Sequence, residues 1–277
     1  MNAEQKPFDL VIAASAVFVG LVFVAACVAP WIAPYGLGGL EEKQMLQTPS
    51  AAHWMGTDSL GRDLLTRVIY GARVSLAVGL GTAAISLLLG TTYGLLAGFK
   101  GGNCDHLMMR IVDIFYGLPD MLIFILLSLL FGRNIGGLLV ALGLVSWVRF
   151  ARIARGQVLQ TKELLFVESA RALGASRGRI LRRHIMPNIV GPVIVTLTFS
   201  IPSAILAEST LSFIGIGIND PYSSWGTSWG TLAQDGYRAM RSYPHMIAFP
   251  AAAIFLTILS FNTLGNGLRD ILDPKQK

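Results

Sequence analysis

The sequence predicts an all-α, polytopic membrane protein with about six transmembrane helices. Of its 277 residues, 53% are hydrophobic and only 14% are charged, whereas soluble domains carry about 25% charged residues. A bilayer core about 30 Å thick is crossed by roughly 20 consecutive, mostly apolar residues. Six stretches supply that length, at approximately Leu10–Trp31, Val74–Phe99, His106–Phe131, Ile135–Ile153, Ile189–Gly215 and His245–Leu268.

The first stretch is predicted to anchor the chain in the membrane. Its apolar run, Leu10–Trp31, is longer than the hydrophobic region of a signal peptide, and no small-residue cleavage site precedes the loop that follows. We therefore expect residues 1–72 to form an anchor helix and an external loop. Residues 73–277 are expected to form one transmembrane domain.

The loop after the anchor contains a helical pattern. Apolar residues recur at helical spacing over Ser59–Tyr70, which predicts a short interfacial helix. Asp58 or Ser59 is placed to cap its N-terminus. Asp63 lies four residues before Arg67, a spacing that allows a weak ion pair.

Three glycines are spaced by four residues in the second span. Gly90, Gly94 and Gly98 form two overlapping G-x-x-x-G steps. Small residues at this spacing let the backbone of another membrane helix approach closely. The pattern predicts helix packing at this face.

The third span is interrupted by polar residues. His106–Phe131 carries Arg110 and Asp113 in its first half and Pro119 followed by Asp120 in its middle. Proline predicts a kink, or the stretch begins in the interface. Asp113 is a candidate for a gate or cargo path, but Arg110 lies three residues away on the same helix face and favours a structural ion pair.

A basic connection, approximately residues 156–187, links the fourth and fifth spans. It contains Glu168-Ser-Ala-Arg-Ala-Leu-Gly174 and ends at Pro187. Gly174 is suited to end one helix, and Ser176 is suited to begin the next. One interpretation is a juxtamembrane loop that binds anionic lipid.

The fifth span contains a carboxylate near its outer end, Glu208. Inserting such a group costs roughly 2.5 to 3.5 kcal/mol at the helix centre, so it should face protein or water. Two hypotheses stay open. Glu208 either forms a structural pair, for example with Arg73 or Arg133, or contributes to the outer gate or cargo path.

Aromatic residues gather in the loop before the last span. They are typical of a belt at the membrane surface, with a cargo-binding role as the alternative. They are Tyr222, Trp225, Trp229, Tyr237 and Tyr243.

The distribution of charge predicts the orientation. If the N-terminus is cytoplasmic, 15 of the 22 Lys and Arg residues lie on the cytoplasmic side. The positive-inside rule then places both termini and the Glu168 connection in the cytoplasm. Because the basic residues follow this alternation, the net charge of +6 does not indicate binding to nucleic acid.

The Glu168 connection resembles the cytoplasmic coupling loop of bacterial ABC importer permeases, whose pattern is E-A-A, three residues, G, nine residues, I-x-L-P. Glu168, Ala170, Gly174 and Pro187 match it; Ser169, His184 and Met186 depart from it but keep size and helix compatibility. The resemblance implies a type I ABC importer permease fold with a cytoplasmic coupling helix between helices 4 and 5. Glu168 and Arg171 would make polar contacts with an ATPase groove, and Gly174 would set the turn.

Three more segments narrow the resemblance to the C-type subunit of the dipeptide/oligopeptide/nickel permeases. They are Gly56–Asp63, Ala207–Gly217 and Phe261–Pro274. This family implies import of di- or oligopeptides by alternating access across the bacterial cytoplasmic (inner) membrane. The implied partners are a second homologous permease, two cytoplasmic ATP-binding subunits and an external solute-binding protein. Nickel, a metal chelate or glutathione are the alternative cargoes.

No chemistry is predicted for the chain itself. It lacks the G-x-x-x-x-G-K-[ST] phosphate loop, so ATP and Mg are expected in partner subunits. The four histidines are isolated, and neither they nor the two cysteines have metal-ligand spacing. An enzyme is therefore not expected. A self-sufficient secondary transporter that uses intramembrane carboxylates is the remaining alternative, although no internal repeat supports it.

Overall fold

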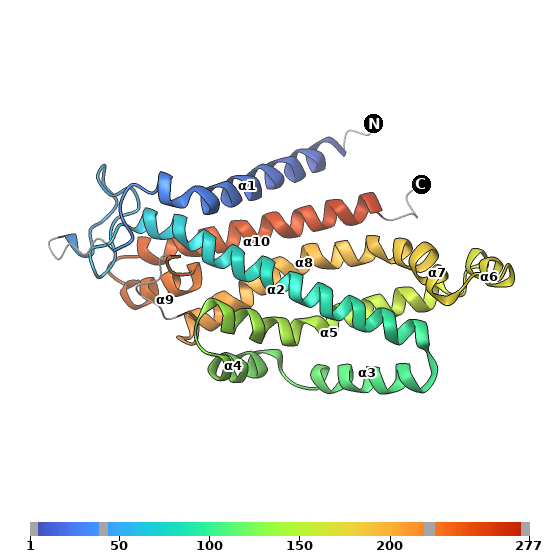
Figure 1. Cartoon of the computed structure of the whole chain (residues 1–277). Helices are drawn as coiled ribbons and strands as arrows, with labels where there is room; N and C mark the ends of the chain where they lie inside the picture. Colours follow the sequence, from blue (N-terminus) through green and yellow to red (C-terminus); the bar gives the residue numbers. More distant parts are fainter. Residues whose placement is uncertain (1–4, 39–43, 219–224, 273–277) are drawn as a thin grey trace.

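The protein is an elongated bundle of helices (Figure 1). The computed structural model describes residues 5–38, 44–218 and 225–272, and within them the chain forms no β-sheet, so the predicted all-α architecture is confirmed. A π-helical turn, Leu181–Ile185, joins α7 to α8. The helices are α1 (Gln5–Ile32), α2 (Leu64–Lys100), α3 (Gly102–Tyr116), α4 (Asp120–Phe131), α5 (Ile135–Thr161), α6 (Leu165–Ala172), α7 (Arg177–Ile180), α8 (Met186–Phe213), α9 (Trp229–Ala239) and α10 (His245–Leu272).

Among the described residues, five helices are long and apolar enough to cross a membrane: α1, α2, α5, α7 continued into α8, and α10. α3 and α4 meet the criterion together, as a pair bent by 90°. The bend lies at Pro119, which has an extended backbone and directly precedes α4. Proline disfavours helical geometry in the residue before it. The kink predicted in the third span is confirmed, and the spans number six if the bent pair counts as one.

α2 begins at Leu64, so the short interfacial helix predicted over Ser59–Tyr70 is wrong. The segment before Leu64 is a loop in which Gly61 has a φ of 75°, a conformation that no right-handed helix contains. Asp63, rather than Asp58 or Ser59, caps α2 by accepting a hydrogen bond from the Thr66 backbone N–H at 2.7 Å. The predicted boundary between the N-terminal part and the transmembrane domain falls inside α2.

The glycines of α2 lie against α5. A Cβ atom at Gly90 would overlap the Trp147 carbonyl oxygen, and one at Gly94 would overlap the Ala151 carbonyl oxygen. At Gly98 a Cβ would come within 3.0 Å of Val158 Cβ. The two backbones are therefore in contact, as the spacing of the glycines predicted.

We expect Gly94→Ala to lower the free energy of unfolding by about 1 to 3 kcal/mol, because the added methyl group forces two backbones apart. Gly156→Ala is the matched control on α5, since a Cβ there meets nothing within 4 Å. Removing a helical glycine should leave that variant unchanged or more stable by up to about 1 kcal/mol. Thermal unfolding in detergent measures both. Equal melting temperatures for the two variants would contradict the close contact.

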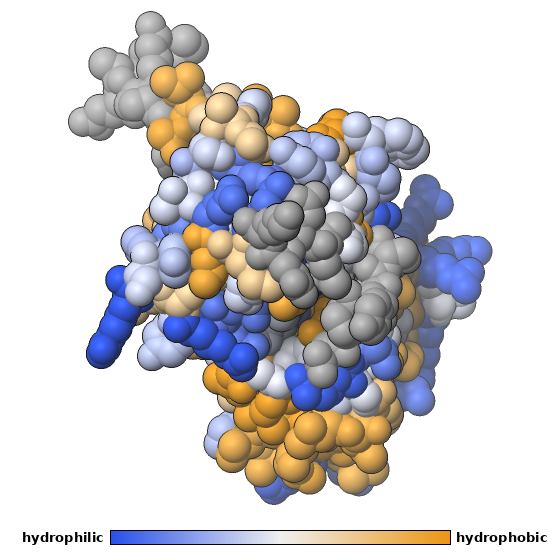
Figure 2. All heavy atoms as spheres, turned by 90° about the vertical axis from the view of Figure 1, so that its left-hand side faces the viewer, coloured by the Kyte–Doolittle hydropathy of each residue, from blue (hydrophilic) through white to orange (hydrophobic). Residues whose placement is uncertain are grey.

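The bundle has two distinct ends. α6, α7, the start of α1 and the end of α10 lie toward one end, and α9 with residues 44–63, which precede α2, lies at the other (Figure 1). Figure 2 looks onto the α9 end, where hydrophilic side chains spread across the face and an apolar region lies at its lower edge. We refer below to the α6 end and the α9 end.

Candidate functional site

α6 projects from the bundle and is anchored by one buried side chain. Val167 is fully buried and packs in an apolar cluster contributed by α2, α5, α7, the π-helical turn and α8. That cluster consists of Leu95, Val158, Ile180, Ile185 and Ile189. Because closely packed side chains transmit strain, a force on α6 would reach several membrane helices through Val167.

Three other apolar side chains of the α6 region are exposed. Leu165 is 80% exposed and Leu173 is 88% exposed, and Phe166 beside them is also exposed. Sequence reasoning missed these residues. For Leu165 and Phe166 the apolar run Leu164–Val167 was the available signal, because a short helix that buries one position of such a run leaves the other three exposed.

The residues singled out in the Glu168 connection lie around α6 as follows. Glu168 and Arg171 are exposed on α6, and Ala170 is half-buried between them. Gly174 has a φ of 81°, in the left-handed region that glycine adopts without strain, and it ends the helix as predicted. Pro187 is exposed in the first turn of α8.

α7 begins where the sequence predicted. The Ser176 side chain caps it by accepting a hydrogen bond from the Arg179 backbone N–H at 3.4 Å. α6 and α7 are thus two short helices separated by the turn at Gly174. The turn holds α6 at an angle to the membrane helices (Figure 1).

Asp113 pairs with a different arginine from the one expected. Its carboxylate accepts a hydrogen bond from Arg152 of α5 at 2.7 Å, so the predicted pair with Arg110 is wrong. One turn further along α5, Arg155 binds both oxygens of Asp105, at 2.6 and 2.7 Å. The two carboxylates of α3 therefore fasten this helix to α5.

Glu208 is fully buried among serines. Ser212 donates a hydrogen bond to Oε1 at 2.6 Å. Ser75 and Ser209 each lie 3.5 Å from Oε2. The carboxyl group joins α2 to α8, and it is enclosed by protein on all sides in this conformation.

The serine cluster continues to the start of α9. Ser228, the N-cap of α9, donates to Ser212 Oγ at 3.3 Å. Ser75 Oγ also accepts a hydrogen bond from the Trp229 backbone N–H at 3.2 Å. Glu208 and its serines therefore fix the beginning of α9 against α2 and α8.

The expected arginine partners of Glu208 lie elsewhere. The guanidinium of Arg73 stacks on the rings of Tyr70 and Trp225, at 5.7 and 5.1 Å from their centroids. Arg133 donates hydrogen bonds to the carbonyl oxygens of Gly215 and Gly217. Pairing of Glu208 with either arginine is therefore wrong.

Trp229 does not belong to an aromatic belt. Its side chain is 2% exposed, and its indole N–H donates to the Val68 carbonyl oxygen at 2.8 Å. Trp225 and Tyr237 are exposed, and Tyr243 is half-buried. Tyr222 lies outside the described residues.

At the α9 end, the loop before α2 is held by charged side chains. Asp63 accepts a hydrogen bond from the ring of His53 at 2.9 Å. The ion pair between Asp63 and Arg67, predicted from their spacing, is wrong. Arg67 binds Asp58 at 2.6 Å and lies 3.5 Å from Asp235 of α9. Arg62 also binds Asp58, at 2.8 Å.

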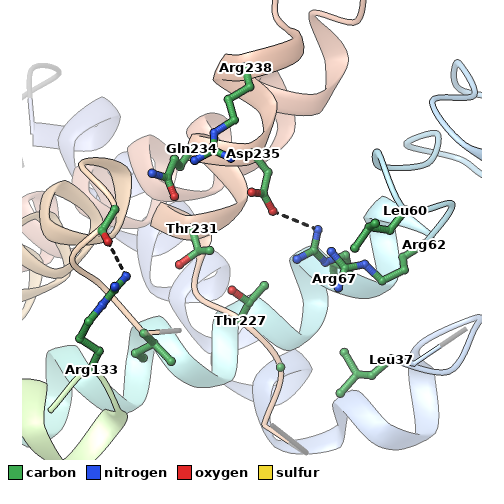
Figure 3. Close-up of a pocket in the computed structure, with 13 residues that line it drawn as sticks. Leu37, Leu60, Arg62, Arg67, Arg133, Thr227, Thr231, Gln234, Asp235 and Arg238 are labelled. Carbon is green, nitrogen blue, oxygen red and sulfur yellow. Dashed lines mark hydrogen bonds and ion pairs between the residues drawn. The ribbon is translucent and has the colours of Figure 1, made fainter. Parts of the chain in front are cut away.

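A polar cavity of about 380 Å³ lies beside this network. Figure 3 shows its charged and polar side chains arranged around one space, with the ion pair between Arg67 and Asp235 on one side and Arg133 on the other. The cavity is lined by Leu37, Leu60, Arg62, Arg67, Arg133, Gly215, Ile218, Gly226, Thr227, Thr231, Gln234, Asp235 and Arg238.

Comparison with known proteins gives consistent results. Residues 90–277 match the family described as "Binding-protein-dependent transport system inner membrane component". The chain is 46% identical over 255 residues to the dipeptide transport system permease protein DppC of Bacillus subtilis, covering 92% of this chain and 78% of that protein. It is 40% identical over 265 residues to the glutathione transport system permease protein GsiD of Pectobacterium atrosepticum, covering 95% of this chain and 87% of that protein.

A solved structure shares the fold. An inward-facing conformation of the MetNI methionine ABC transporter contains a chain that superposes with a TM-score of 0.61, at 14% sequence identity. The match covers 76% of this chain and 96% of that one.

Proposed function

Because this chain belongs to the binding-protein-dependent transport system inner membrane components, we propose that it forms half of the translocation pathway of an ATP-driven peptide importer. It is an ABC transporter permease, related to the C-type subunits of the peptide permeases. The observation that supports an ATP-driven mechanism is α6, a short projecting helix that begins with the exposed Leu165 and is followed directly by the exposed Leu173. Exposed apolar side chains of this kind are suited to a protein partner.

In the proposed mechanism, α6 sits in a groove of a cytoplasmic ATPase subunit. Glu168 and Arg171 contact the rim of the groove, and the leucines occupy its floor. When ATP binding closes the ATPase pair, α6 moves, and Val167 carries the motion to α2, α5 and α8 through the cluster described above. A second, homologous permease completes the pathway, and the ATPase subunits supply ATP and Mg.

The proposed orientation follows from charge. The stretch from Arg149 to Arg183 holds nine of the chain's 22 Lys and Arg residues. It runs from α5 through α6 and α7 at the α6 end, toward which α1 begins and α10 ends (Figure 1). The positive-inside rule supports a cytoplasmic α6 end in the bacterial inner membrane. The α9 end would then face the external solute-binding protein that delivers cargo.

The proposed cargo is a di- or oligopeptide, on the strength of the similarity to DppC and OppC proteins. Similarity to GsiD proteins supports glutathione, itself a small peptide, as the second candidate. We expect vesicles that contain the full complex to accumulate labelled dipeptide or longer peptide only with internal ATP.

Glu168→Ala should reduce that uptake by about tenfold without reducing insertion, in line with the loss of about 1.4 kcal/mol of coupling. Glu163→Ala, an exposed carboxylate just before α6, is the control. Uptake of nickel or glutathione alone would reassign the cargo. Uptake by this chain without ATPase subunits would overturn the ATP-driven mechanism.

A further inference from the structure

The cavity at the α9 end has more positive than negative charge. Among the residues that the structure describes, its lining contains four arginines and one carboxylate, Asp235. Nearby Asp58 is already saturated: Oδ2 accepts from both Arg62 and Arg67, and Oδ1 accepts from the backbone N–H groups of Leu60 and Arg62. The positive charge that remains attracts an anion.

The arginines retain donors for such an anion. Each guanidinium carries five N–H groups, of which Arg62 and Arg67 use few in the contacts described. Arg67 is 6% exposed, and a buried cation is stabilised by anionic partners. Arg238, on α9, forms no ion pair with any residue of the described segments.

The cavity also suits a small ligand. Its volume of about 380 Å³ lies within the range of roughly 300 to 1,000 Å³ that is usual for small-molecule sites. Thr227, Thr231 and Gln234 add uncharged hydrogen-bonding groups (Figure 3). A carboxylate matches the planar fork of a guanidinium, which binds it through two parallel hydrogen bonds.

We propose that this cavity is a binding site for the carboxylate of a small peptide, at the face where cargo enters. The inference rests on the proposed function, because it takes the α9 end as the outer face and a peptide as the cargo. The site would hold the C-terminal carboxylate while the rest of the peptide passes into the bundle. Arg238 is the exposed member of the arginine cluster, and Arg67 is its buried member.

Direct binding tests the proposal. Equilibrium dialysis measures the affinity of the intact complex in nanodiscs, without the external binding protein, for a radiolabelled dipeptide and for the C-terminal amide of that dipeptide. We expect Arg238→Gln to weaken binding of the free acid about fivefold, equivalent to about 1 kcal/mol, and to leave the amide unchanged. Arg241→Gln is the matched control, because Arg241 is exposed three residues further on and lies outside the cavity lining.

Three results would overturn the proposal. One is equal binding of acid and amide by the unaltered complex. Another is an equal effect of the Arg238 and Arg241 variants. In the third, the complex that carries Arg238→Gln docks the external binding protein more weakly but still prefers the free-acid dipeptide to the amide as strongly as the unaltered complex does. That result would assign the cavity to an acidic side chain of the binding protein. ATP-dependent peptide uptake, measured in parallel, separates failure of this site from failure of the proposed function.

Discussion

We expect the double substitution Leu165→Ser and Leu173→Ser to reduce ATP-dependent uptake by at least about tenfold, with normal insertion and stability. Both side chains are at least 80% exposed, so the fold loses no packing. Burying a leucine in a partner's groove contributes about 1.5 to 3 kcal/mol. Losing two such contacts weakens attachment of an ATPase subunit by more than a factor of ten. Copurification of the ATPase subunits and uptake into vesicles measure the effect.

Met45→Ser is the control for this prediction, because Met45 is an exposed apolar residue, 43% accessible, in the segment that precedes α2 and not in the Glu168 connection. It should leave both copurification and uptake unchanged. Full uptake by the double variant would show that the leucines face lipid or water in the assembled transporter. Normal copurification of the ATPase subunits with lost uptake would show that the leucines transmit the motion of the ATPase but are not needed for its attachment.

The sequence was most informative where structure depends on neighbouring residues. Gly174 ends α6 and Ser176 caps α7, because turns and caps are decided within a few positions. The four-residue spacing of Gly90 and Gly94 likewise predicted a close helix contact, since these positions share one helix face. The spacing does not say which helix makes the contact, and the structure identifies that helix as α5.

Pairings between distant segments could not be predicted. Asp113 binds Arg152, 39 positions away, and the nearer Arg110 was chosen because only local spacing is visible in a sequence. Helical periodicity also misled at Asp63, since apolar residues recur on both sides of it while Gly61 prevents the helix from beginning earlier. Exposure of Leu173 likewise depends on how α6 leaves the bundle.

The partners of Glu208 could not be predicted either, because three of its neighbours are serines, which carry no charge that would suggest a pairing. Ser209 and Ser212 lie within four residues of it, but Ser75 lies on another helix. A buried carboxyl group in a membrane protein is often functional. Here its hydrogen bonds hold three helices together, which accounts for its position without a role in transport.

We therefore expect Glu208→Ala to lower the free energy of unfolding by about 3 kcal/mol. Hydrogen bonds between membrane helices contribute about 0.6 kcal/mol each, and buried hydroxyl groups left without an acceptor add a penalty of about 1 kcal/mol or more. Glu208→Gln keeps the volume and the acceptor oxygen, so its loss should be about 1 kcal/mol. Thermal unfolding of the purified complex, compared with vesicle uptake, measures both variants.

Ser203→Ala is the matched control on α8, because Ser203 is exposed and, within the described part of the chain, its hydroxyl donates a hydrogen bond only to the Phe199 carbonyl oxygen of its own helix. It should leave the melting temperature unchanged. If Glu208 is structural, uptake by Glu208→Gln will follow its stability and remain near normal. If Glu208→Gln is fully stable but transports nothing, the carboxylate itself acts in the cargo path, and the serine cluster must open during the transport cycle to expose it.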